Sequence, residues 1–61
     1  MSEERLFTVA QVAERLQVNP ETVRRWLRTG ELRGILLGRK AGFRVAESDL
    51  KAFIDSRKLA A

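Results

Sequence analysis

The stretch FTVAQVAERLQVNPETVRRWLRTG, residues 7–30, decides the fold, because it holds two helix-start signals a short distance apart. Thr8 is a favourable N-cap, and Gln11, three residues later, completes a capping box. Apolar residues follow at positions 9, 12, 13 and 16, the spacing of one buried helical face. These signals predict a first helix over Val9–Leu16.

A second start signal follows after residues 17–19. Asn19 is a good N-cap, and Pro20 falls at the first helical position, which tolerates its missing N–H. Gly30 can adopt the left-handed conformation that ends a helix. A second helix is therefore predicted over Pro20–Thr29, with an inner face of Val23, Trp26 and Leu27. Two amphipathic helices joined by so short a turn form a helix-turn-helix.

After Gly30 the apolar pattern changes from a helical period to alternation around a Gly-bounded loop, which predicts a β-hairpin. We expect its inward-facing residues to be Ile35, Leu37, Phe43 and Val45. Leu36 and Arg44 are expected on the outer side.

A last helix is predicted to begin near Glu47, with Leu50, Phe53 and Ile54 facing inward. The fold class is thus mainly α with a small β-hairpin, in the order helix, helix, hairpin, helix. We expect a single domain over residues 1–61, ordered from about residue 6 to 57 with frayed termini.

The composition excludes several classes of protein. The 61 residues include no cysteine and no histidine, so disulfides, most metal sites and most nucleophile–base pairs are ruled out. We therefore expect neither an enzyme nor a cofactor. The longest aliphatic run, residues 35–37, is too short to cross a bilayer, so a cytoplasmic protein without a membrane partner is expected.

The charge is distributed unevenly along the chain. Twelve basic residues against eight acidic ones give a net charge of +4. Residues 22–44 contain seven basic residues and a single acid, Glu31, so this stretch carries +6 and the remainder −2. A concentrated basic stripe of this kind is typical of a nucleic-acid binder.

The phase of the second helix places this charge on one face. Arg25 and Arg28 point away from the apolar face beside Glu21, with Arg24 and Thr22 on the flanks. The major groove of B-DNA admits an α-helix, and arginine bonds bidentately to guanine there. A purely solubilising role for three arginines within five positions, with only Glu21 to balance them, is the weaker interpretation.

The hairpin loop adds Arg39 and Lys40 at its tip, which favours a wing touching phosphates or the minor groove over a simple solvated turn. Trp26 is interpreted as a core residue. The scarcity of other aromatics argues against single-stranded or RNA-type recognition. One alternative stays open at this point: a protein-interaction module that uses its basic face to dock an acidic partner.

Six segments, taken in their order along the chain, resemble the sequence pattern of the excisionase-type branch of the MerR-like winged helix-turn-helix proteins. They are FTVAQVA (7–13), VNPETVRRW (18–26), GEL (30–32), GRK (38–40), FRV (43–45) and SDLKAFI (48–54). The resemblance covers about residues 6–55. It implies a recognition helix, residues 20–29, in the major groove of double-stranded DNA and a wing, residues 38–44, on the backbone or minor groove.

The resemblance also assigns contacts by position. The recognition-helix contacts would be Thr22, Arg24, Arg25 and Arg28, and the wing contacts Arg39, Lys40 and Arg44. The helix N-terminus near Thr8 would offer N–H groups to a phosphate. Expected roles are transcription regulation or excisionase-like architectural assistance to recombination, with the protein associated with the nucleoid when bound.

The partners implied are a recombinase or the transcription machinery, together with further copies on adjacent DNA sites. Leu36, where relatives often carry a polar residue, is a candidate for that self-association. No small-molecule ligand is expected, because the sequence ends after the predicted third helix and contains no effector domain.

Overall fold

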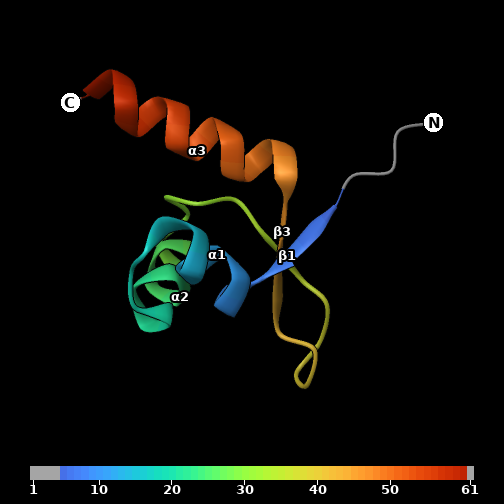
Figure 1. Cartoon of the computed structure of the whole chain (residues 1–61). Helices are drawn as coiled ribbons and strands as arrows, with labels where there is room; N and C mark the ends of the chain where they lie inside the picture. The colour runs from blue at the N-terminus through green and yellow to red at the C-terminus, as the bar shows by residue number, and fades with distance from the viewer. Residues whose placement is uncertain (1–4, 61) are drawn as a thin grey trace.

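The computed structural model describes the backbone of residues 5–60 and the side chains of residues 5–57. Within them the elements follow the order β1 (Leu6–Thr8), α1 (Val9–Leu16), α2 (Pro20–Thr29), β2 (Ile35–Leu36), β3 (Phe43–Ala46) and α3 (Glu47–Ala60). The helices α1 and α2 pack together beside the sheet, α3 lies across one end, and the β2–β3 loop extends from the other (Figure 1). The expected fraying falls partly on residues 1–4 and 61, outside the described residues.

The caps of the first two helices confirm the predicted boundaries. The Thr8 hydroxyl accepts a hydrogen bond from the Gln11 N–H at 3.1 Å, and Gln11 Oε1 accepts one from the Thr8 N–H at 2.9 Å. Asn19 Oδ1 accepts from the Glu21 N–H at 2.9 Å. Gly30 ends α2 in the left-handed region, at φ 89°. These bonds satisfy backbone groups that a helix end otherwise leaves unpaired.

The sheet contains a strand that the sequence pattern did not predict. Within the described residues it is three-stranded and antiparallel, in the order β1-β3-β2. Thr8 ends β1 opposite Arg44 and caps α1, so strand and helix meet without a loop. At the other end, the Glu47 N–H at the start of α3 donates to the Arg5 carbonyl at 3.0 Å. The central strand β3 therefore pairs with the strand that leads into α1, and it leads directly into α3 itself.

The expectation that Ile35 and Leu37 face the helices is wrong. The two residues are 48% and 53% exposed. Ile35 pairs with Arg44, and Leu36 with Phe43, which places Ile35 on the face opposite Phe43 and Val45.

The position of Gly34 explains why Ile35 faces outward. A Cβ built on Gly34 would lie 2.5 Å from Leu27 Cδ2 and 3.2 Å from the Arg44 carbonyl oxygen. Residue 34 thus lies against α2, and the alternation of a strand then turns residue 35 outward. Leu36 is exposed, but the expectation that it lies on the outer side is wrong, because its pairing with Phe43 places it on the same face of the sheet as Phe43 and Val45.

The core lies between the sheet and the helices. Its buried residues are Phe7, Val12, Ala13, Val23, Leu27, Leu32, Val45 and Leu50. Leu32, only 1% exposed, lies in the α2–β2 connection, where sequence periodicity gave no signal. The predicted inner residues Trp26, Phe53 and Ile54 are half-buried and pack against this core.

Candidate nucleic-acid interface

The outward face of α2 carries three exposed arginines and one acid. Glu21 pairs with Arg24 at 3.1 Å and with Arg28 at 3.6 Å. Arg25 has no ion pair or side-chain hydrogen bond among the described residues. Thr22, predicted on the flank, is half-buried. Exposed ion pairs contribute little stability, so Arg24 and Arg28 can exchange Glu21 for another anion at small cost.

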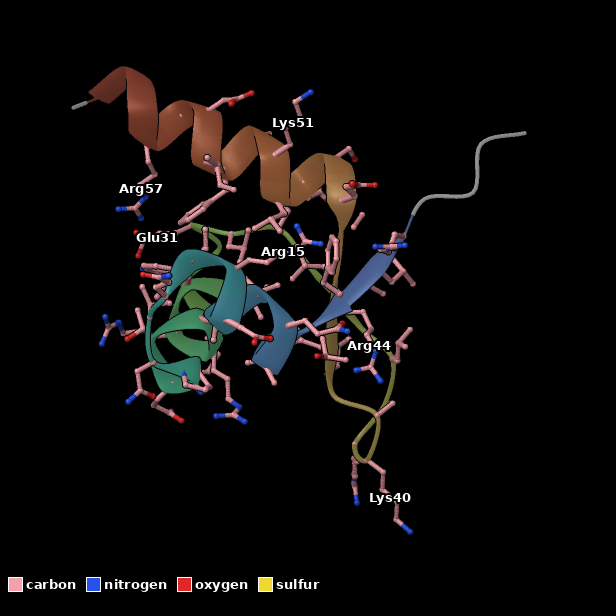
Figure 2. The ribbon with its side chains drawn as sticks, viewed as in Figure 1. Arg15, Glu31, Lys40, Arg44, Lys51 and Arg57 are labelled. Carbon is pink, nitrogen blue, oxygen red and sulfur yellow. The ribbon has the colours of Figure 1, made fainter. Side chains whose placement is uncertain are left out.

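The loop between β2 and β3 forms a narrow, basic projection. It is closed by hydrogen bonds from the Gly42 N–H to the Gly38 carbonyl at 2.9 Å and from the Leu37 N–H to the Gly42 carbonyl at 3.0 Å. Arg39 and Lys40 are exposed at its tip, and Lys40 points away from the body of the protein (Figure 2). We call residues 38–44 the wing from here on.

Arg44 differs from the other predicted contacts because the wing itself holds its side chain. Its Nη1 donates to the Ala41 carbonyl at 2.6 Å and to the Phe43 carbonyl at 3.0 Å. The residue is half-buried and lies between the wing tip and the body (Figure 2). Arg44 therefore braces the wing, and its positive charge is held at the wing's base.

A cleft of about 390 Å³ brings the separate elements together. The start of α1 at Thr8 forms one wall, Arg24 of α2 another, and the wing, with Lys40 and Arg44, the third. Its lining includes three cations and no acid. Because the N-terminus of a helix also favours negative charge, the chemistry of this cleft suits an anion such as a phosphate group.

The six basic residues among the predicted contacts thus divide into two groups. Arg24, Lys40 and Arg44 line one cleft. Arg25, Arg28 and Arg39 are exposed outside it. Sequence reasoning missed two features of this surface. One is the pair of ion pairs that Glu21 forms with two arginines, and the other is the set of hydrogen bonds by which Arg44 braces the wing. The separation of three residues between Glu21 and Arg24 was a usable signal for the first. The second depends on the wing's conformation and has no sequence signal.

The residues that the structure describes contain no group of three acidic side chains placed to hold a metal ion. In the same part of the chain, no helix is both long enough and apolar enough to cross a bilayer.

The comparison with protein families supports the architecture just described. The helix-turn-helix domain family matches residues 6–58, nearly the whole chain. The protein therefore belongs to this family of DNA-binding helix-turn-helix domains, and its fold is mainly helical with a β-hairpin that forms the wing. No curated protein matches the chain.

Proposed function

We propose that this protein binds double-stranded DNA with α2 in the major groove and the wing on the adjacent backbone or minor groove. The cleft between the start of α1, Arg24 and the wing is the observation that supports this arrangement most strongly. A phosphate in that cleft would meet a helix N-terminus and three cations, while the exposed face of α2 lies next to it.

The two parts of the surface have different tasks in this proposal. The exposed guanidinium of Arg25, which no described side chain engages, reads base edges, with Arg28 and Thr22 beside it. Arg24, Arg39, Lys40 and Arg44 neutralise phosphates and fix the position of the helix. The ten residues of α2 extend over about 15 Å, long enough to follow the floor of a groove about 12 Å wide.

The proposed biological role is that of a small transcription regulator or an excisionase-like architectural factor in recombination, acting in the cytoplasm on the nucleoid. The resemblance to the excisionase-type branch of the MerR-like proteins supports this finer assignment. A single module of this size covers little DNA, so several copies on adjacent sites would supply the specificity. A recombinase or the transcription machinery would be the protein partner, and the proposal contains no catalytic step.

The test is a titration of fluorescent duplex DNA with the protein at several salt concentrations. If about five phosphates are neutralised, log K falls against log[salt] with a slope near −4.5. A slope near zero, or no binding at low salt by a folded sample, would refute the proposal. That result would favour the second candidate, a module whose basic face docks an acidic protein. Footprinting on genomic fragments would then identify the preferred DNA site.

A further inference from the structure

Ile35, Leu36 and Leu37 form a run of exposed aliphatic side chains along one edge of the sheet. We call this segment the β2 edge. The three residues are 48%, 62% and 53% exposed. The strand order β1-β3-β2 gives β2 a neighbour on one side only. Natural edge strands usually carry charges, prolines or a covering element, so three consecutive exposed aliphatic residues here call for an explanation. DNA binding by α2 and the wing supplies none.

The backbone of the β2 edge is open to a further strand. The Leu37 N–H donates to the Gly42 carbonyl, so the backbone groups of Leu37 point toward β3. In an antiparallel pair, the N–H and carbonyl groups of successive residues in one strand point alternately toward and away from the paired strand. The N–H and carbonyl of Leu36 therefore point away from the sheet. An extended chain can hydrogen-bond to them and cover the neighbouring aliphatic side chains, as in β-strand addition.

The charges around the β2 edge indicate what kind of chain fits. The sequence has no acidic residue between Glu31 and Glu47. Arg33 and Arg39 stand on either side of the aliphatic run, and both are exposed. A complementary segment therefore has apolar residues in its middle and acidic residues at its ends.

We propose that the β2 edge binds an extended segment of a partner protein, apolar at its centre and acidic at both ends, as an added antiparallel strand. Duplex DNA fits this edge poorly, since its backbone offers neither apolar side chains nor peptide groups. A second copy of the chain also fits poorly. Two β2 edges paired about Leu36 would bring the exposed cations Arg33 and Arg39 of both copies to the same interface with no acidic residue between Glu31 and Glu47 to balance them, and like charges brought together are destabilising.

The probe is a short fluorescent peptide in which valine alternates with threonine between glutamate ends, titrated with the protein and followed by anisotropy. We expect it to bind the wild-type protein. Leu36→Thr should weaken binding about tenfold, the order expected when the burial of one leucine is lost. Leu6→Thr is the matched control, because Leu6 is 44% exposed on the opposite edge of the same sheet, and it should bind like wild type. A peptide with lysine ends should not bind.

A second pair of variants tests the backbone contact. Leu36→Pro removes the outward N–H without removing a bond to β3, and Leu36→Ala removes the side chain alone. The proline variant should bind more weakly than the alanine variant while both keep the wild-type circular dichroism. If the proline variant loses that spectrum, the comparison of Leu36→Thr with Leu6→Thr still decides the matter.

Four results would overturn the proposal: no binding of the acidic peptide to folded protein, equal binding by Leu36→Thr and Leu6→Thr, equal binding of the lysine-ended peptide, or wild-type dimers in sedimentation that Leu36→Thr abolishes. The last would assign the edge to a second copy. Arg25→Ala should leave peptide binding unchanged, so failure of the DNA-binding proposal and failure of this one are separable.

Discussion

The rings of Trp26 on α2 and Phe53 on α3 lie with their centroids 5.0 Å apart at an interplanar angle of 47°. The Arg57 guanidinium lies over both rings, 5.2 Å from the Trp26 centroid and 4.6 Å from that of Phe53. Its Nη2 also donates to Glu31 Oε1 at 3.2 Å, between α3 and the end of α2 (Figure 2). These contacts attach α3 to α2 far from the chain connection at β3.

Arg57→Ala should lower the free energy of unfolding by about 1 kcal/mol, because an exposed cation–π contact and an exposed ion pair each contribute a fraction of that. Urea denaturation followed by the emission of Trp26, the chain's only tryptophan, measures the change. Lys51→Ala on the exposed side of the same helix is the control. If both variants have the same stability, the contacts around Arg57 do not hold α3 in place.

Arg25→Ala should weaken binding to the preferred DNA sequence more than binding to random duplex, because a bidentate base contact is worth about 1–3 kcal/mol of discrimination. Arg39→Ala should weaken both by similar factors, since a phosphate contact carries no sequence information. Competition titrations with specific and random duplexes give the two ratios. An unchanged specificity ratio in Arg25→Ala would show that another part of the surface reads the bases.

Glu21→Gln should strengthen DNA binding. The change removes the one negative charge from the outward face of α2 and releases Arg24 and Arg28 from their ion pairs. Gln keeps the size of the side chain, so the fold should persist. Titrations at low and high salt check this, with Glu14→Gln on the exposed surface of α1 as the control. Weaker binding by Glu21→Gln would mean that Glu21 positions the arginines and does not merely compete with DNA.

Gly34→Ala should destabilise the protein by about 1–3 kcal/mol, because the added Cβ would press on the buried Leu27 side chain and the Arg44 carbonyl. Gly30→Ala gives a useful comparison. It meets no atom within 4 Å but retains φ 89°, which costs an alanine about 1–2 kcal/mol. Thermal denaturation of both variants, each alone and each combined with Leu27→Val, separates the steric cost from the cost of the backbone conformation. Only the Gly34→Ala cost should shrink when Leu27 is made smaller.

The helical part of the fold was predictable because its determinants are local. The caps at Thr8 and Asn19, the proline at position 20 and the stop at Gly30 each act over a few residues, and α1 and α2 have the predicted bounds. The charge of the proposed interface was predictable for a related reason: helical phase fixes which arginines of α2 face outward.

The sheet was predictable only in part because its determinants lie far apart in the sequence. The strand β1 exists because Phe7 pairs with Val45, a contact that no local pattern encodes. The orientation of Ile35 follows from the close approach of Gly34 to α2, which two alternating aliphatic residues do not reveal. The pairing of Arg44 with the wing carbonyls likewise depends on a conformation that only the folded loop has. The assignments of the DNA contacts stay predictions.

The pairing of β1 with β3 has a consequence for recognition. Because Thr8 belongs to β1, caps α1 and lies opposite Arg44 at the base of the wing, the start of α1 is joined directly to the strand that carries the wing. With α2 in a major groove as proposed, the wing would reach the neighbouring phosphates at a fixed separation. DNA whose groove width matches that separation would bind without distortion, and other sequences would pay a deformation energy. The protein would then discriminate between sequences at base pairs that none of its side chains touch.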